Sequence, residues 1–320
     1  MNGVEIGAMY MGGADSGVKE FGIAAEAAGF DSVWTGDHLA HYIDGIAGLG
    51  ILAGCTERVT IGSNVLVVPF RRPAVIAKAL LTVAQSAGRR VVMGVGPGGD
   101  VPIEFAMAGA DHSTRGRYTD EALDVIAGLW SGRPFSYAGE WNNFGDVVME
   151  PVAGARPDVW IGGRSAAALR RAVLRGRGYN PYLVSPDQVA ARYRELRTVA
   201  TEVGVDLGRG FDFAATTFYV PGADAEDALQ RGYGRVGFSG VSEQHFRRAY
   251  ILGDVEDLRR GIDAYLAAGV RHLVVGCAPG APRQLDAFVG AFTEILDEVR
   301  GTLGTPTVTN APTEGTRSRP

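Results

Sequence analysis

The sequence predicts an α/β protein in which eight parallel strands, each followed by a helix, close into a (β/α)₈ TIM barrel. Short runs rich in β-branched residues alternate with longer segments of helical periodicity almost from end to end. Strands that alternate with helices form parallel sheets with right-handed crossovers. Eight such units suit a closed barrel better than an open doubly wound sheet, which is the alternative fold.

The first half of the chain supplies four of these units. The expected strands are residues 4–10, 32–35, 60–68 and 90–96, and the expected helices are residues 18–28, 73–86 and 116–130. Apolar residues recur at helical spacing in the first helix, and Gly29 follows it as a natural C-terminal stop.

The second half supplies the remaining four units after an insertion at residues 134–151. The expected strands are residues 159–162, 179–184, 211–220 and 272–276, and the expected helices are residues 165–175, 186–203, 225–233, 255–268 and 282–299. Residues 301–320 are rich in Thr, Pro, Gly and Arg and have no apolar period, so we expect a disordered tail. Residues 1–300 are then the barrel domain.

Composition excludes several classes of function. The 31 basic and 36 acidic residues give a net charge of −5, and the scattered basic residues argue against a nucleic-acid partner. Cys55 and Cys277 lie far apart without a C-x-x-C partner, which gives no support to a disulfide framework or a thiolate zinc site. No apolar run approaches the ~18 residues of a membrane span. We expect a cytoplasmic protein that acts on a small molecule.

The pair Asp37-His38 directly follows the expected strand 32–35. In a barrel the ends of the strands meet at the face where catalysis occurs. His38 is therefore a candidate for proton transfer, with Asp37 to hold its tautomer or accept a proton. Alternatively, Asp37 caps the next helix and His38 packs beneath it. His41 completes an H-x-x-H spacing, but no histidine–carboxylate cluster accompanies it, so we expect no metal.

The expected strand 60–68 contains Ser63 and Asn64, which a buried parallel strand normally avoids. A bulge that backs a ligand and a simple barrel bend both explain this pattern. Arg71 and Arg72 follow, and we expect them to be solvated, as exposed arginines usually are.

Two glycine clusters stand at strand-to-helix turns, at residues 96–99 and 162–165. The second has Ser165 at the helix start, an arrangement that can hold a phosphate with backbone amides and a hydroxyl. Together the clusters favour an anionic cofactor over chance glycine turns. Neither matches the dinucleotide fingerprint, because no acidic residue ends a following strand in a compact βαβ unit.

A possible cover for the site is the aromatic insertion at residues 134–151, which contains Tyr137, Trp141 and Phe144. It is long for a simple connection. The alternative is that its aromatic residues attach it to the barrel wall. Arg117 and Glu121 stand four apart on the preceding helix and are expected to form an ion pair within that helix.

Five segments in order resemble the bacterial-luciferase-like superfamily, whose barrels hold FMN or the deazaflavin coenzyme F420. The segments are residues 24–34 leading into Asp37-His38, residues 56–63, residues 73–78, residues 94–96 with Glu104-Phe105, and residues 160–163. The resemblance covers roughly residues 4–300 and implies a flavin-type ring lying across the strand ends.

The resemblance also implies a role for particular residues. It puts His38 near the reactive ring edge as the catalytic residue and Asp37 beside the cofactor. It implies a non-prolyl cis peptide at Asn64-Val65 behind the ring, next to Ser63. The phosphate arm falls on Gly96, Pro97, Gly98 and Gly99 and on Gly162, Gly163, Arg164 and Ser165. Tyr42 and Phe70 are expected in the substrate pocket.

The sequence departs from the family at four places. Tyr42 stands where the dehydrogenase branch of the deazaflavin enzymes has a catalytic Trp, and Gly99 stands where that branch has a Glu, which makes sugar-phosphate dehydrogenase activity improbable. The usual Leu-Asp before the fourth strand is Val83-Ala84, and the usual Gly-Asp-Gly-Trp is residues 176–179, Gly-Arg-Gly-Tyr. Loss of these two acids reflects either a replaced structural ion pair or weakened cofactor binding.

The sequence therefore predicts an oxidoreductase that moves a hydride between a flavin-type cofactor and a small organic substrate. Coenzyme F420 is favoured slightly over FMN, on the Gly62 to Val65 strand and on a lysine-poor, arginine-rich composition typical of a high-GC genome. A reduced-FMN monooxygenase is the close alternative. A non-catalytic flavin-binding protein and a metal-dependent barrel hydrolase are the more distant ones. We expect a homodimer.

Overall fold

Eight parallel strands form a closed ring in the computed structural model, which describes residues 4–12, 17–88, 91–99, 101–150, 156–208, 210–233, 242–277 and 288–296. In ring order the strands are β1 (Glu5–Tyr10), β2 (Ser32–Thr35), β3 (Thr60–Ser63), β5 (Val91–Gly96), β8 (Asp158–Gly162), β9 (Gly178–Asn180), β10 (Asp212–Pro221) and β12 (His272–Cys277). The ring closes where β12 pairs with β1, Glu5 lying opposite His272. The predicted barrel is confirmed, and the open sheet is wrong.

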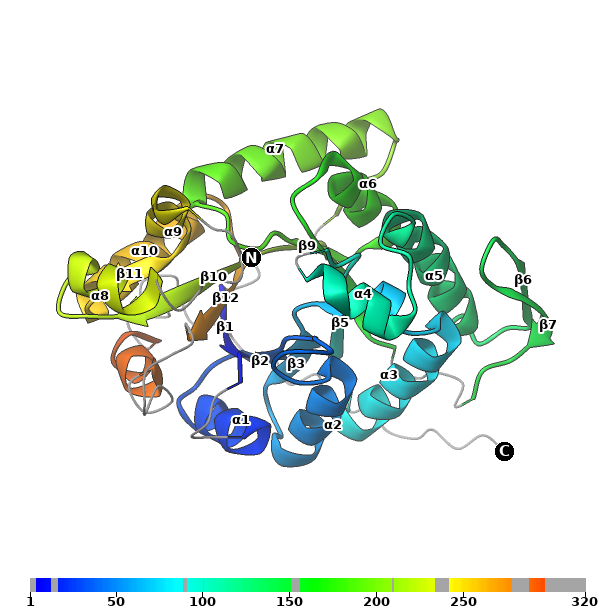
Figure 1. Cartoon of the computed structure of the whole chain (residues 1–320), viewed down its shortest axis with the longest axis horizontal. Coiled ribbons are helices and arrows are strands. Elements are labelled where there is room, and N and C mark those ends of the chain that lie inside the picture. Colours follow the sequence, from blue (N-terminus) through cyan, green and yellow to red (C-terminus); the bar gives the residue numbers. More distant parts are fainter. Residues whose placement is uncertain are drawn as a thin grey trace, which may run out of the picture.

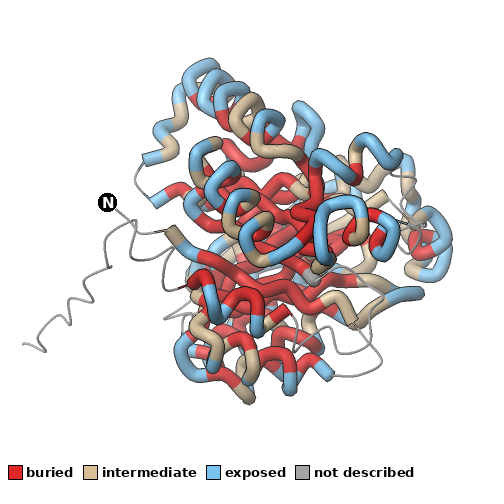
Figure 2. Tube along the Cα trace, turned by 90° about the vertical axis from the view of Figure 1, so that its left-hand side faces the viewer, coloured by how far each residue is buried: buried red, intermediate tan, exposed pale blue. Residues whose placement is uncertain are grey.

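Helices surround this ring (Figure 1). Those predicted are α1 (Val18–Ala27), α3 (Pro73–Ala87), α5 (Arg115–Leu129), α6 (Ala166–Arg175), α7 (Pro186–Glu202), α8 (Ala225–Gly232) and α10 (Val255–Ala267). Residues 288–296 are helical within the last predicted helix, and the predicted tail lies outside the described residues. Figure 2 shows buried residues along the strands and exposed residues on the outer helix faces. The main core therefore lies between the ring and the helices.

The sequence did not reveal several short elements. They are α2 (Gly45–Cys55), α4 (Pro102–Ala108), α9 (Glu243–Ala249), β11 (Ile251–Gly253) and a hairpin of β6 (Phe135–Ala138) and β7 (Asn143–Val147). Helix α2 contains no charged residue and four glycines, so it has no polar face to mark a helical period. Its N-terminus is fixed by the Asp44 side chain, which accepts a hydrogen bond from the Ala47 amide.

Two predicted strands end earlier than expected. The strand predicted at residues 60–68 is split into β3 and β4 (Leu66–Val67), followed by the short 3₁₀ helix η1 (Val68–Phe70). The strand predicted at residues 179–184 ends at Asn180. Pro181 follows directly and has no N–H to donate to a neighbouring strand, which accounts for this early end.

The predicted ion pair between Arg117 and Glu121 is wrong, because both side chains hold the hairpin instead. Arg117 pairs with Glu140 at 2.6 Å, while the Glu121 carboxylate accepts hydrogen bonds from the amides of Glu140, Trp141 and Asn142. In Figure 1 the hairpin lies beside α5, outside the ring of strands. The structure thus favours attachment to the wall over a cover for the barrel.

The amino ends of the strands are closed by stacked aromatic rings inside the barrel. Trp34 and Trp160 stack with their centroids 4.9 Å apart, and the His272 ring packs edge-on against both. The Ser32 hydroxyl accepts from Trp34 Nε1 at 2.7 Å and shares a 2.7 Å hydrogen bond with His272 Nε2. Ser32 and Trp34 are both fully buried, so these contacts lie inside the barrel.

Candidate active site at the carboxyl ends of the strands

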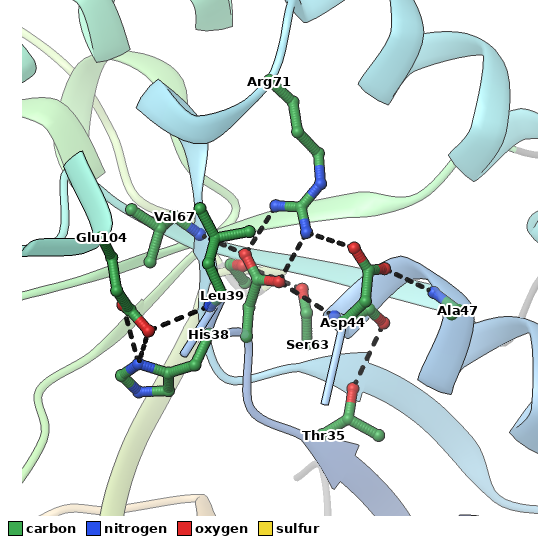
Figure 3. A network of polar contacts seen from close by, with 12 residues as sticks. Thr35, His38, Leu39, Asp44, Ala47, Ser63, Val67, Arg71 and Glu104 are labelled. Atoms are coloured by element: carbon green, nitrogen blue, oxygen red, sulfur yellow. Dashed lines mark hydrogen bonds and ion pairs between the residues drawn. The ribbon is translucent and has the colours of Figure 1, made fainter. Parts of the chain in front are cut away.

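The residues after β2 are anchored by the buried carboxylate of Asp37. Its two oxygens accept hydrogen bonds from the amides of Gly45 and Val67, both at 2.9 Å, and from the Arg71 guanidinium at 2.7 Å. Arg71 also binds Asp44 at 2.6 Å (Figure 3). Asp37 therefore fixes the loop and accepts from the first amide of α2, which is closer to the capping alternative than to a partner of His38.

Arg71 is not solvated, contrary to the sequence-based expectation. Its side chain is 13 % exposed and bridges the carboxylates of Asp37 and Asp44. Burial alone would lower the pKa of the Arg71 guanidinium, but the hydrogen bonds and charges of the two carboxylates outweigh burial and raise that pKa. Arg71 is thus a fixed charge between the loop after β2 and helix η1.

His38 is held by a carboxylate from a distant part of the sequence. Glu104, in α4, is 2 % exposed, and its Oε2 lies 3.0 Å from His38 Nδ1 (Figure 3). Glu104 Oε1 also accepts hydrogen bonds from the amides of Leu39 and Ala40. An ionised carboxylate can only accept, so we assign the proton of the neutral imidazole to Nδ1. His38 Nε2 is then the nitrogen that can take a proton.

A closed set of hydrogen bonds crosses the interior of the barrel and includes Asn180, the last residue of β9, and Asn64, directly after β3. Asn64 Nδ2 donates to Thr216 Oγ1 at 2.7 Å, Thr216 donates to Asn180 Oδ1 at 3.0 Å, and Asn180 Nδ2 donates to Asn64 Oδ1 at 3.2 Å. All three side chains are buried. These three hydrogen bonds connect β9 and β10 to the segment between β3 and β4.

The implied cis peptide is present at Asn64-Val65. Ser63 is buried and its hydroxyl donates to the Gly94 carbonyl at 2.8 Å. Val65 turns towards the strands β5 and β8, where a Cβ placed at Gly96 or Gly162 would lie 3.0 Å from a Val65 methyl group. The glycines at these strand ends therefore let the Val65 side chain pack directly against the backbone of β5 and β8.

The two glycine clusters come together, because β5 and β8 pair with Val95 opposite Ile161. Gly98 and Gly99 have φ values of 66° and 136°, and Gly163 has a φ of 111°, conformations that favour glycine. Arg164 is exposed, and the Ser165 hydroxyl caps α6 by accepting from the Ala168 amide. The Ser165 hydroxyl acts as an acceptor in this cap, and its own O–H can still donate.

Two residues that the sequence analysis missed face the first glycine cluster. A Cβ at Gly99 would lie 3.3 Å from Arg115 Nε and 3.5 Å from His112 Nε2. Among the described residues, His112 Nε2 is buried without a hydrogen-bond partner. Because the Arg115 guanidinium can only donate and lies 3.4 Å from His112 Nδ1, we assign the proton of the neutral imidazole to Nε2, a buried donor that has room for an acceptor. An anionic group bound at Gly98-Gly99 would satisfy it beside the Arg115 charge.

The predicted pocket residues lie in different places. Tyr42 lies beside His38, with ring centroids 5.2 Å apart, and has a positive φ of 54°. Phe70 instead packs edge-on against Phe105, which packs against His112. Phe70 therefore belongs to the region of the glycine clusters.

The two positions at which the family has an acidic residue lie away from the carboxyl end of the barrel. Val83 and Ala84 are buried in α3 on the outside of the ring. Arg177 precedes β9 at the amino end of the strands, where it lies 3.9 Å from Asp158. Their positions favour the replacement of structural contacts over a change at the cofactor end.

Neither a metal site nor a membrane span is found within the described parts of the chain. No group of three or more His, Cys, Asp or Glu side chains there could hold a metal ion. None of the helices described is both long and apolar enough to cross a membrane.

Known proteins include relatives of this chain. The chain is 33 % identical over 211 residues to an F420-dependent glucose-6-phosphate dehydrogenase of Microbacterium testaceum, a match that covers 63 % of this chain and 62 % of that protein. A protein of the same name from Nakamurella multipartita is 28 % identical over 324 residues, with 90 % and 94 % covered.

Solved structures share the fold at low sequence identity. An F420-dependent secondary alcohol dehydrogenase in complex with an F420-acetone adduct has a TM-score of 0.83 at 20 % identity, covering 93 % of this chain and 99 % of that one. The FMN-bound oxygenating constituent of 3,6-diketocamphane monooxygenase from Pseudomonas putida has a TM-score of 0.74 at 17 % identity, covering 95 % and 100 %. The family model "Luciferase-like monooxygenase" matches residues 7–268, and the chain therefore belongs to this family of F420- or flavin-dependent oxidoreductases.

Proposed function

We propose that this protein transfers a hydride between coenzyme F420 and a small organic substrate, with His38 as the proton-transfer residue. The observation that carries the proposal is the buried Glu104 carboxylate on His38 Nδ1, which leaves Nε2 as a proton acceptor at the carboxyl end of the barrel. F420 is preferred over FMN because the relatives reported above are named as F420-dependent enzymes.

The described residues fit such a coenzyme. Gly96 and Gly162 with Val65 would back the ring, and Gly98, Gly99, His112 and Arg115 would hold the phosphate. When bound, the coenzyme would supply the site that accepts or donates the hydride. His38 Nε2 would take the proton of a substrate hydroxyl, or return it in the reverse reaction. Glu104 would keep the His38 imidazole oriented and would stabilise the imidazolium that forms when His38 takes the proton.

The experiment that tests the proposal is a titration of the purified protein with F420 and, separately, with FMN, followed by fluorescence and absorbance. We expect micromolar binding of F420. Binding of FMN alone, with oxygen uptake that depends on substrate, would replace the proposal with a reduced-FMN monooxygenase, an activity suggested by the likeness to the Pseudomonas enzyme. Binding without turnover of any substrate would indicate a non-catalytic binding protein.

His38→Ala tests the assigned residue directly. We expect kcat to fall by about 100-fold or more, as for loss of a general acid or base, while F420 affinity changes little. Unchanged turnover would remove His38 from the mechanism. A homodimeric state and a cytoplasmic location remain predictions from the sequence, and light scattering of the purified protein tests the first.

A further inference from the structure

A polar layer lies between apolar residues inside the barrel. It consists of Asn64, Asn180 and Thr216, which we call the polar triad and which are all buried. Side chains two positions apart on a strand share a face, and the neighbours of Thr216 on its face of β10 are Ala214 and Phe218, both buried and apolar. Burial of polar groups costs free energy unless they are hydrogen-bonded. A polar layer at this depth therefore requires an explanation.

Thr216 is the centre of this layer. Its hydroxyl accepts a hydrogen bond from Asn64 Nδ2 at 2.7 Å and donates one to Asn180 Oδ1 at 3.0 Å. Its backbone N–H donates to the Pro181 carbonyl at 3.0 Å, and its carbonyl accepts from the Leu183 amide at 3.1 Å. Side chain and backbone of Thr216 thus both join β10 to the segment that follows β9.

That segment has an uncommon backbone conformation. Leu183 has a φ of 50°, in the left-handed region that a leucine seldom adopts. Its carbonyl lies 3.0 Å from His245 Nε2 in α9, and the next carbonyl, of Val184, accepts from the Tyr265 hydroxyl of α10 at 2.8 Å. Such a conformation persists only where its surroundings fix it, and it is most common near functional sites. Contacts from β10, α9 and α10 fix residues 181–184 here.

The polar triad also adjoins the surface that would back the coenzyme ring in the proposed function. Asn64 directly precedes Val65, and Asn180 pairs with Gly162 across β8 and β9. Val65 and Gly162 are themselves in contact, because a Cβ at Gly162 would lie 3.0 Å from a Val65 methyl group. Thr216 therefore holds one neighbour of each of these two residues.

We infer that Thr216 is a positioning residue for the coenzyme ring, acting through Asn64 and Asn180 to fix Val65 and Gly162 relative to each other. The inference rests on the proposed function. A fully paired set of buried polar groups favours a single arrangement. Without the Thr216 hydroxyl, Asn180 Oδ1 loses its donor, and Asn64 Nδ2 keeps only the weak acceptor Met9 Sδ at 3.5 Å.

The test compares Thr216→Val with Thr217→Val in the full chain. Both residues are buried in β10, and the Thr217 hydroxyl donates to the Ala249 carbonyl at 2.6 Å, on the opposite face of the strand. Each change removes a buried hydroxyl, so both should lower the thermal midpoint. Only Thr216→Val should weaken F420 binding, by about tenfold for the lost buried hydrogen bonds. Thr216→Ser keeps the hydroxyl and should bind F420 as tightly as wild type.

A second ligand shows which part of the coenzyme is affected. The probe is the deazaflavin ring with its ribityl chain and no phosphate, and its fluorescence reports binding as that of F420 does. Thr216→Val should lose affinity for this probe by the same factor as for F420. Arg115→Met, beside Gly99, should weaken F420 binding and leave binding of the probe unchanged. If Thr216→Val does not fold, Asn180→Leu, which removes the acceptor of the Thr216 hydroxyl, is measured in its place.

The outcomes separate the inference from the function on which it rests. Wild-type affinity in Thr216→Val, an equal loss in Thr217→Val, or a loss for F420 but not for the probe would overturn the role of Thr216 and leave the cofactor proposal standing. If FMN binds instead of F420, the same comparison is made with FMN and riboflavin. Absence of binding of either coenzyme to the wild type would overturn both proposals.

Discussion

Glu104 sets the state in which His38 can react, and it does so through one contact between residues 66 positions apart. Its carboxylate occupies His38 Nδ1 and also accepts from the amides of Leu39 and Ala40. No local spacing relates Glu104 to His38. The sequence analysis therefore used Glu104 only as part of a family motif and offered Asp37 as the partner of His38.

Glu104→Gln should lower kcat by about 100-fold while F420 affinity is largely kept. The amide oxygen can still accept from the two backbone amides, but the imidazolium loses its anionic partner and the tautomer is no longer fixed. Steady-state kinetics with F420 and the best substrate measures this. Glu140→Gln, in the exposed pair with Arg117, is the control and should keep full turnover. Equal rates for both variants would contradict the assigned role.

Arg71→Met should lower the free energy of unfolding by about 3 kcal/mol, because it leaves the buried Asp37 carboxylate without its charge partner. Arg72→Met is the matched control in the next residue, which is exposed, and should change stability by less than about 0.5 kcal/mol. Urea unfolding of the two variants gives the comparison. Similar midpoints would show that the amides of Gly45 and Val67 suffice to hold Asp37.

At the scale of elements, the sequence predicted a strand at each of the eight ring positions, because short apolar runs, most of them rich in β-branched residues, end there in turns. It missed α2, whose residues from Gly45 to Cys55 are apolar or glycine and so show no helical period. It also predicted one strand where β3 and β4 are separate. Local patterns report burial and turns, whereas a contact such as Glu121 with the hairpin depends on which elements become neighbours in space.

Glu121→Ala should loosen the β6–β7 hairpin without affecting turnover. The variant removes the acceptor for the amides of Glu140, Trp141 and Asn142, and the hairpin lies outside the ring in Figure 1. Hydrogen exchange of residues 135–147 should become faster, with no change elsewhere. Glu195→Ala, an exposed pair member on α7, is the control. A loss of catalytic activity would indicate that the hairpin does reach the substrate.

The same carboxylate predicts how the hairpin responds to pH. Burial tends to raise the pKa of Glu121, but the hydrogen bonds from Asn142, Trp141 and Glu140 outweigh burial and lower it below its ordinary value of 4.5. A lowered pKa stabilises the folded hairpin above pH 4.5, and this stabilisation is lost as the pH falls through the lowered value. Trp141 fluorescence should therefore change at acid pH before global unfolding, and should not do so in Glu121→Ala.

Across the whole molecule, the two ends of the barrel differ in what they bury. The carboxyl end carries His38, Arg115 and the glycine turns, whereas the amino end is closed by Trp34 and Trp160 with hydrogen-bonded polar groups. There His272 Nδ1 lies 2.8 Å from Glu5, and this hydrogen bond lowers the pKa of Glu5. In this fold the active site is expected at the carboxyl ends of the strands, and residues at the amino ends are expected to contribute to stability.

Asp212→Asn at the closed end should therefore stabilise the protein at neutral pH without changing turnover. Burial raises the pKa of Asp212, so its ionised form carries a cost in the folded state that is present above the raised pKa and disappears as the pH falls. Asparagine keeps an oxygen that can accept from Trp160 Nε1, which lies 3.0 Å from Asp212. Thermal midpoints should be higher than wild type at pH 7, with the difference narrowing towards pH 4. Asp158→Asn, on an exposed carboxylate at the same end, should shift the midpoint little. A lower midpoint for Asp212→Asn at pH 7 would mean that the charge is needed to stabilise His272, and the closed end would then depend on ion pairing more than on burial.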